Sequence, residues 1–286
     1  MNAKGKSVDT TFLSIENAEE RGFIHRDYIA HCLRWSHVIK QLFKNNAWKT
    51  AKILDIGCGR ELPFAKTLYS SRLIVKKYSG VDVGKINPAP FNTGKFPLVI
   101  YPETDFLKLD LANAEIEFSH IISFEMLEHV EPRHAIDILK KIWQWSLPQS
   151  AENPTRIYIS TPIWNGCDCA DNHVNEMKYH ALGWMLEEIG FHIVDVFGTF
   201  ASQSDYVHKM DPAHKEAFED LKSYYDSNLL SCIFAPFYPE QSRNAMWALE
   251  KGEPKRHRLF TAEQLAACKP WGSSTNNADM GKVWEE

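Results

Sequence analysis

Short apolar runs and amphipathic stretches alternate along most of the chain. The apolar runs end at Gly, Pro or Asp, which is typical of strands buried on both faces of a parallel sheet. The amphipathic stretches between them carry apolar residues at spacings of three and four, which predicts helices. Strands are predicted over residues 51–56, 78–83, 97–101, 120–124, 156–161, 191–198 and 243–249.

Helices are predicted at 63–73, 132–145 and 178–189, with a longer one before the first strand, from Ala18 to Lys44. Pro63 suits the first turn of its helix, and Gly190 suits the left-handed residue that closes one. Repeated alternation of strand and helix predicts a Rossmann-like α/β fold, with a seven-stranded, mostly parallel sheet and helices on both faces. The last predicted strand, Arg243–Leu249, is expected to return to an edge of this sheet.

The chain divides into three predicted parts. Residues 1–49 form a polar leader and an N-terminal helical cap, residues 50–251 form the main domain, and residues 252–286 form a polar, mobile tail. An amphipathic stretch at about 205–230 interrupts the strand pattern and predicts a helical insertion. The cap and the insertion are expected to cover the ligand crevice and to select the substrate.

The composition disfavours several classes of protein. The formal net charge is −5 and the pI is about 6.2, so no global charge draws the chain to a phosphate backbone. The N-terminus lacks the apolar core of a secretory signal, and no apolar run is long enough to cross a bilayer. Six scattered cysteines favour free thiols in a reducing compartment. We therefore expect a cytoplasmic protein with no membrane partner and leave its oligomeric state open.

Two glycines follow the first predicted strand directly, in the segment Ile53-Leu-Asp-Ile-Gly-Cys-Gly59. Glycines in this position let the backbone turn tightly and approach a ligand closely. Asp82 stands at the end of the next strand, where a carboxylate can bind both hydroxyls of a ribose. The Gly-x-Gly-x-x-Gly pattern of nicotinamide enzymes fails, because Leu62 stands where its third glycine belongs. A nicotinamide oxidoreductase is therefore disfavoured.

Asp55 precedes the first glycine by two residues, and this Asp-x-Gly-x-Gly arrangement resembles motif I of the class I S-adenosylmethionine-dependent methyltransferases. Within residues 50–200 the same resemblance is carried by Gly80-Val-Asp-Val83, Phe106-Leu-Lys-Leu-Asp-Leu111 and Ile121-Ile-Ser-Phe-Glu-Met-Leu-Glu-His-Val130. The chain departs from the family at Glu61, where many members have a third glycine.

The resemblance implies a site for S-adenosylmethionine. It implies that Asp55, Gly57 and Gly59 line the methionine and ribose portion of the cofactor. Asp82 would bind the ribose hydroxyls, and Asp110 with Leu111 would border the adenine.

The segment after the fourth predicted strand supplies candidate catalytic residues. Glu125, Glu128 and His129 share one side if the chain makes a helical turn here, and the carboxyl ends of parallel strands face the ligand crevice. Glu125 is expected to hold the methionine amine of the cofactor or to compensate its sulfonium charge. His129 is the candidate general base, since its ordinary pKa suits proton removal near neutral pH. His173, in a later loop with Glu176, is a further candidate catalytic residue.

This segment is similar to a variant of methyltransferase motif IV seen in small-molecule and O-directed enzymes. Some O-methyltransferases bind a divalent ion through such a Glu-x-x-Glu-His and a later histidine, here Glu125, Glu128, His129 and His173. A cation there would polarise an acceptor hydroxyl. We expect the alternative, in which no metal is bound and alignment of the reactants suffices. The Asp/Asn-Pro-Pro-Tyr motif and the Pro-Cys dipeptide of base-directed enzymes do not occur in the sequence.

The sequence thus predicts methyl transfer from S-adenosylmethionine to an oxygen, or alternatively a nitrogen, of a small molecule or modified nucleotide. One alternative is methylation of a nucleic acid, which strong and salt-sensitive binding to DNA or RNA would favour. Another is a non-catalytic cofactor-binding or scaffold protein, in which Glu125 and His129 would be dispensable.

Overall fold

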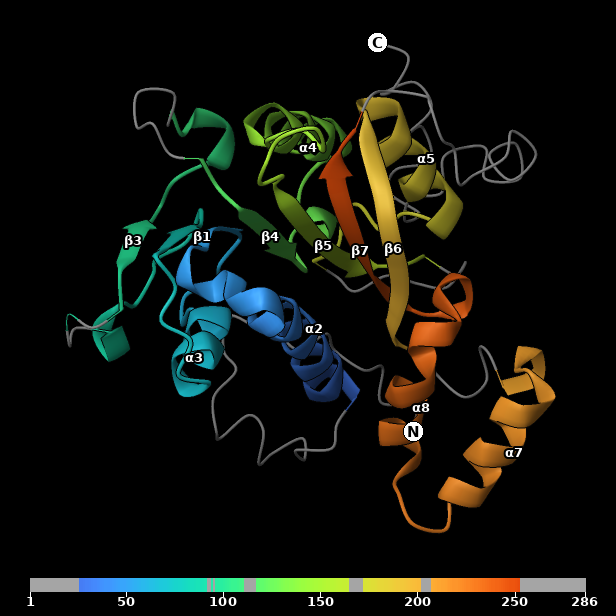
Figure 1. The fold of residues 1–286 in the computed structure, drawn as a ribbon. Coiled ribbons are helices and arrows are strands. Elements are labelled where there is room, and N and C mark those ends of the chain that lie inside the picture. The colour runs from blue at the N-terminus through green and yellow to red at the C-terminus, as the bar shows by residue number, and fades with distance from the viewer. Residues whose placement is uncertain are drawn as a thin grey trace.

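A seven-stranded sheet forms the centre of the molecule (Figure 1). The computed structural model describes residues 26–91, 94, 96–110, 117–164, 172–201 and 207–252. The strands are β1 Lys52–Ile56, β2 Lys77–Val81, β3 Leu98–Tyr101, β4 His120–Phe124, β5 Arg156–Pro162, β6 Phe191–Phe200 and β7 Asn244–Lys251. Their order is β3-β2-β1-β4-β5-β7-β6, and β7 alone runs opposite to the other six strands. The predicted α/β fold with a mostly parallel sheet is confirmed.

The position of β7 differs from the prediction that the last strand lies at the sheet edge. β7 pairs with β5 on one side and β6 on the other, so β6 is the edge strand. Burial explains the difference, because residues Asn244 to Glu250 are all buried while β6 exposes Val194 and Asp195. The unbroken apolar run in β7 is typical of a strand with neighbours on both sides.

Helices cover both faces of the sheet (Figure 1). They are α2 Arg26–Phe43, α3 Pro63–Ser70, α4 Pro132–Trp145, α5 Tyr179–Ile189, α7 Pro212–Leu221 and α8 Ser227–Phe234. Helices α4 and α5 pack on one face and share one hydrophobic cluster with it, whereas α2 and α3 pack on the other face in a second cluster. No helix in the described part of the chain is both long and apolar enough to span a bilayer.

Local sequence signals explain most helix ends. Pro63 and Pro132 begin α3 and α4, where a missing backbone N–H costs nothing. Gly190 closes α5 in the left-handed conformation, with φ of 112°. Helix α3 ends at Ser70, three residues before its predicted end. The start of the predicted Ala18–Lys44 helix lies outside the described residues, as does the predicted tail.

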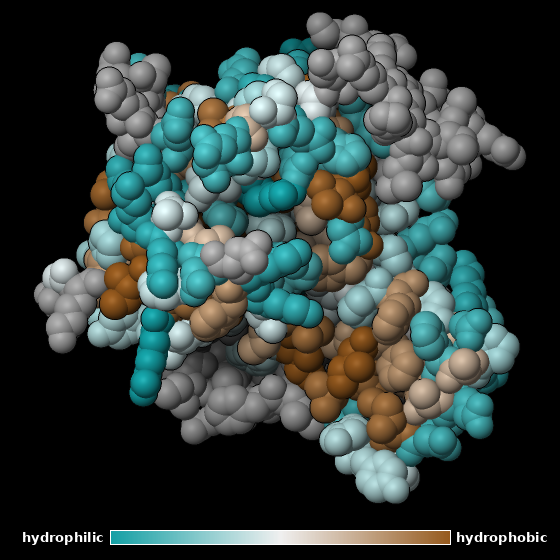
Figure 2. Space-filling model, viewed as in Figure 1, coloured by the Kyte–Doolittle hydropathy of each residue, from teal (hydrophilic) through white to brown (hydrophobic). Residues whose placement is uncertain are grey.

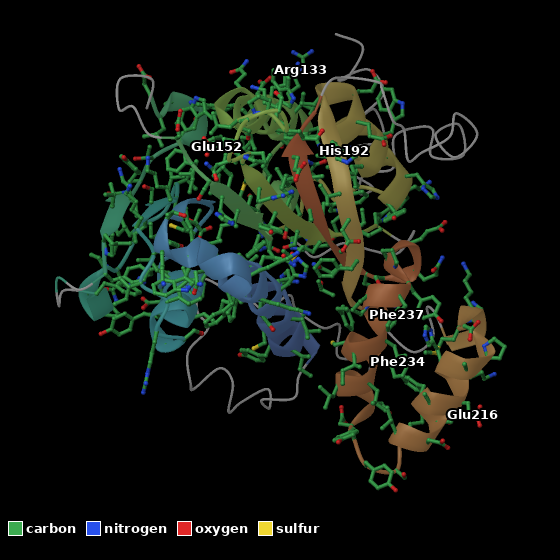
Figure 3. All side chains as sticks on the ribbon, viewed as in Figure 1. Arg133, Glu152, His192, Glu216, Phe234 and Phe237 are labelled. Carbon is green, nitrogen blue, oxygen red and sulfur yellow. The ribbon has the colours of Figure 1, made fainter. Side chains whose placement is uncertain are left out.

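The predicted helical insertion at about 205–230 consists of α7 and α8, which continue to Phe234 and project beyond the sheet (Figure 1). A third, separate cluster of buried residues holds the two helices together. Phe234 ends α8 and Phe237 follows it. Both lie on the side of α8 that faces α7 (Figure 3) and contact the ring of His214 in α7. Figure 2 shows apolar residues gathered over α8, where Ile233 and Phe237 are exposed.

Candidate functional site

The turn after β1 has glycine, and so no side chain, at two positions. Gly57 and Gly59 have φ of 72° and 70°, a left-handed conformation that disfavours side chains. The N–H groups of Gly57 and Cys58 both donate to the carbonyl oxygen of Val81, at 2.9 and 3.2 Å, which fixes the turn against the end of β2. A Cβ on Gly57 would lie 2.6 Å from Cγ of Met126, so the loop after β4 approaches the turn as closely as a glycine permits.

Asp82 lies at this turn, as the sequence predicts. Its Oδ2 accepts a hydrogen bond from the Gly59 N–H at 2.9 Å, and its Oδ1 accepts one from the Gly84 N–H at 2.7 Å. The two backbone donors hold the carboxylate beside the second glycine of the turn. Each carboxylate oxygen can accept further hydrogen bonds, so the group keeps capacity for the hydroxyls of a ligand.

Asp55 is placed differently from the other turn residues. Its side chain is buried and accepts a hydrogen bond from the Tyr78 hydroxyl. Burial raises the pKa of Asp55 to about 7, with the Tyr78 hydrogen bond opposing the rise and Asp82 adding to it. The carboxyl group is therefore engaged inside the protein, and its expected contact with a cofactor stays a prediction.

The predicted adenine border lies after β3. Asp110 is exposed, and Leu111 lies outside the described residues. The segment leading to Asp110 is held by Lys141 of α4, whose Nζ donates to the carbonyl oxygens of Phe106, Leu107 and Leu109 at 2.9, 2.8 and 2.6 Å.

Glu125 follows β4 and has a left-handed φ of 52°. Its Oε1 accepts a hydrogen bond from the Ser160 hydroxyl at 2.7 Å, and its Oε2 accepts one from the Asn244 amide at 2.6 Å. Nη1 of Arg34, from α2, lies 3.6 Å from Oε1. Strands β5 and β7 and helix α2 thus hold this carboxylate together.

Arg34 is a functional candidate that the sequence analysis missed. It is 1% exposed, and its guanidinium donates to Thr199 and Asn244 at 3.2 and 3.0 Å and contacts His31 at 2.6 Å. A signal was present in the pattern, because the buried stripe of α2 at four-residue spacing is Ala30, Arg34, Val38 and Leu42. A charge on such a stripe predicts a buried partner.

Glu128, His129 and His173 come together, with one ligand atom from each lying within 4.8 Å of the others. Glu128 is buried, and burial followed by the nearby charge of Glu125 raises its pKa well above the usual range. The rings of His129 and His173 meet edge to face at 4.9 Å, and Glu176 contacts Nδ1 of His173. Glu125 does not join this group, because its two oxygens bind Ser160 and Asn244.

Residues 26–196 match the family model of a methyltransferase domain, which covers more than half of the chain. The magnesium protoporphyrin IX methyltransferase of Synechocystis PCC 6803, with bound S-adenosylmethionine, is 12% identical over 81% of this chain and 85% of that chain, with a TM-score of 0.47. An S-adenosylmethionine-dependent methyltransferase of Clostridium acetobutylicum is 11% identical over 77% and 91%, with a TM-score of 0.47. A small RNA methyltransferase is 13% identical over 80% of this chain and 26% of that chain, with a TM-score of 0.49. No curated protein sequence matched.

Proposed function

The chain belongs to the methyltransferase domain family, and from that premise we propose that it transfers a methyl group from S-adenosylmethionine to an oxygen of a small molecule or modified nucleotide. A nitrogen acceptor is the alternative. The observation that carries the proposal is the contact between the glycine turn and Asp82, at 2.9 Å from the Gly59 N–H to Oδ2. This contact brings the backbone of two glycines and a carboxylate that could bind a ribose to one place at the carboxyl edge of the sheet.

The residues at this edge fit the cofactor. Gly57 and Gly59 both have a positive φ, so a Cβ at either position would strain the backbone, and at Gly57 it would also meet Met126. Gly80 of β2 also packs closely against this turn, since a Cβ there would lie 2.9 Å from Sγ of Cys58. Asp82, Gly57 and Gly59 would hold the ribose and methionine portion, and Asp110 with Leu111 would border the adenine.

The cofactor supplies an electrophilic methyl group on a sulfonium when it is bound. The chain must then align an acceptor with that methyl and remove the acceptor's proton. His129 suits the second task, because Nδ1 lies 3.1 Å from the carbonyl oxygen of Asn172. A carbonyl only accepts hydrogen bonds, so Nδ1 carries the proton and Nε2 is the basic nitrogen.

Glu125 and His173 act in this proposal by position and charge. Glu125, held by Ser160 and Asn244, places a negative charge beside the Met126 loop that packs on the glycine turn. Its charge would favour a sulfonium nearby. His173 packs against the ring of His129 and keeps that ring in place.

A second candidate mechanism is metal-assisted transfer, which the convergence of Glu128, His129 and His173 favours. A carboxylate and two imidazoles suit a divalent transition metal, which would polarise the acceptor oxygen. Dialysis against a chelator separates the two mechanisms. Activity that survives dialysis supports His129 as a base, whereas activity lost and then restored by Mn²⁺ or Fe²⁺ supports the metal.

The proposed function is tested by following a labelled methyl group. The protein is incubated with methyl-labelled S-adenosylmethionine in three separate reactions, which contain a metabolite extract, RNA or DNA as the acceptor. We expect label in the small-molecule fraction and none with the Asp82→Ala variant. Label confined to RNA or DNA would support a nucleic-acid methyltransferase instead. Cofactor binding without any transfer would support the non-catalytic alternative.

A further inference from the structure

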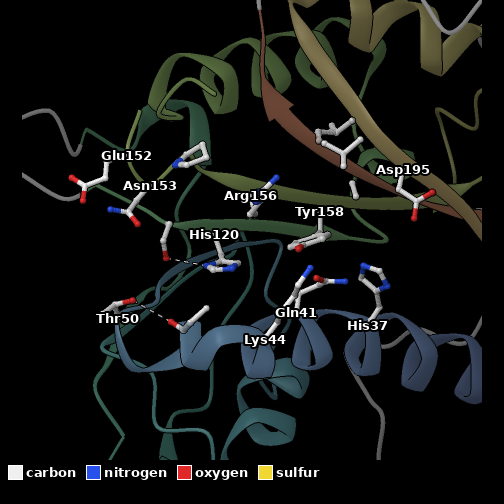
Figure 4. Close-up of a pocket in the computed structure, with 16 residues that line it drawn as sticks. His37, Gln41, Lys44, Thr50, His120, Glu152, Asn153, Arg156, Tyr158 and Asp195 are labelled. Atoms are coloured by element: carbon white, nitrogen blue, oxygen red, sulfur yellow. Dashed lines mark hydrogen bonds between the residues drawn. The ribbon is translucent and has the colours of Figure 1, made fainter. Parts of the chain in front are cut away.

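A cavity of about 590 Å³ lies at the sheet edge opposite the glycine turn. It is lined where β4 and β5 begin, by His120, Arg156 and Tyr158. On the other side it is lined by His37 and Gln41 of α2 and by Lys44 directly after α2 (Figure 4). The glycine turn follows the carboxyl end of β1, which is parallel to β4, so the two places are at opposite ends of the strands. The volume lies within the range of about 300–1,000 Å³ typical of small-ligand sites.

Two polar atoms of the cavity lining have no hydrogen-bond partner within the described protein and are open to the cavity. His120 bonds Ser119 through Nδ1 at 2.9 Å, and no described group bonds its Nε2. The hydroxyl of Tyr158, a residue only 4% exposed, has no hydrogen-bond partner in the described part of the chain either. Solvent reaches both atoms through the cavity, so they are available to a ligand.

The shape of the lining favours a flat ligand. The rings of His120 and Tyr158 are nearly parallel, at 15° with centroids 6.5 Å apart, and lie side by side on the sheet face (Figure 4). The ring of His37 meets Tyr158 edge to face at 5.8 Å. Burial, with the charge of Arg156 adding to it, lowers the pKa of His120 to about 4, so its ring is neutral at pH 7. Neutral aromatic rings of this kind form a platform on which a nucleobase stacks.

Charge distinguishes the middle of the cavity from its ends. Glu152 and Asp195 lie at the two ends, while Lys44 and Arg156 project into the middle (Figure 4). Arg156 is paired with Glu250, whereas Lys44 has no carboxylate partner among the described residues. An anionic group in the middle of the cavity could therefore pair with Lys44. Inorganic phosphate alone would pair with this cation but would neither contact the aromatic rings nor fill the cavity.

We propose that this cavity, framed by Gln41 of α2, by Lys44 directly after α2 and by His120 and Tyr158 of the sheet, binds a nucleoside monophosphate. The base lies on the His120 and Tyr158 rings, its edge bonds the Gln41 amide, and its phosphate lies at Lys44. The site is separate from the proposed cofactor site, and the inference does not depend on the proposed function.

Calorimetric titration of the full-length protein tests the proposal. The protein is first saturated with S-adenosylhomocysteine, so that adenosine groups cannot enter the proposed cofactor site, and is then titrated with adenosine or guanosine 5′-monophosphate. We expect one of the two to bind with one-to-one stoichiometry. Gln41→Ala, which removes a hydrogen bond, and Tyr158→Ala, which removes a stacking ring, should each weaken binding about tenfold.

The remaining variants locate the phosphate and provide the control. Lys44→Ala should weaken the nucleotide but not the nucleoside, whereas Lys40→Ala, an exposed lysine of α2 outside the cavity lining, should change neither. Competition by a short single-stranded RNA would identify a nucleotide within a strand as the ligand, and its failure to compete would identify a free nucleotide. No binding of either monophosphate, or binding that the Gln41 and Tyr158 variants leave unchanged, would overturn the proposal.

Discussion

Asp55, two residues before the first glycine of the turn, makes the stability of the folded protein depend on pH. Its folded-state pKa of about 7 lies above the ordinary value of 3.8, so the folded protein holds this proton more tightly than the unfolded chain does. The resulting stability is complete below about pH 4 and is lost as pH rises toward 7. The loss amounts to at most about 4 kcal/mol, at about 1.4 kcal/mol per pKa unit.

We expect Asp55→Asn to remove this pH dependence, because an amide does not ionise. Urea unfolding at pH 4.5 and pH 7 should give a larger fall in the free energy of unfolding for the unaltered protein than for the variant. Equal falls would mean that Asp55 ionises normally in the folded protein.

Gly57 and Gly94 form a matched pair, with φ of 72° and 68°. A Cβ on Gly94 would meet no described residue within 4 Å, whereas one on Gly57 would meet Met126 at 2.6 Å. Both alanine variants carry the backbone strain, of about 1–3 kcal/mol, but only Gly57→Ala adds overpacking, of about 1–3 kcal/mol. Chemical denaturation should therefore rank Gly57→Ala as the less stable. Equal losses would show that the Met126 loop moves aside freely.

At the level of elements, α2 is joined to the core by a charge as well as by apolar packing. Arg34 lies 3.6 Å from Glu125, and both contact Asn244 of β7. Removing one partner of a buried pair leaves the other charge uncompensated, which costs about 3–5 kcal/mol. The loop after β4 therefore depends on a helix that precedes the first strand of the sheet.

A double-mutant cycle measures this dependence. Arg34→Met and Glu125→Gln should each destabilise the protein by about 3–5 kcal/mol, because each leaves the other side chain with an unpaired charge. The double variant removes both charges and should therefore lose less stability than the sum of the two single variants. Urea unfolding of the four proteins gives the coupling energy. Strict additivity would mean that the two side chains do not interact.

Sequence patterns predicted those elements whose signals are local. Helix α4 has its predicted bounds because Pro132 fixes its start and an amphipathic repeat fills its length. The position of Asp82 beside the turn was also predictable, because neighbouring parallel strands end at the same edge of a sheet. The position of β7 and the partners of Glu125 were not predictable in this way, because Ser160, Asn244 and Arg34 come from distant segments that only the strand order brings together.

On the scale of the molecule, the α7–α8 unit has a core of its own. Phe218 is fully buried in it and packs on Phe234 at 5.5 Å between ring centroids. We expect Phe218→Ala, at a cost of about 3–5 kcal/mol, to open this unit while the sheet stays folded. Hydrogen exchange should show protection lost in α7 and α8 but kept in β1 and β4. The control is Tyr224→Ala, at a residue 79% exposed, and loss of protection throughout the sheet would contradict a separate unit.

The central claim is that the carboxyl edge of the sheet, at the glycine turn and Asp82, binds an adenosyl cofactor. Calorimetric titration with S-adenosylhomocysteine tests it most directly, on the unaltered protein, on Asp82→Ala, and on Asp137→Ala as an exposed carboxylate of α4. We predict one-to-one binding that the Asp82 variant weakens at least about tenfold, as loss of charged hydrogen bonds to a ribose requires, and that the Asp137 variant leaves unchanged. No binding by the unaltered protein, or equal affinity in a folded Asp82→Ala protein, would contradict the account.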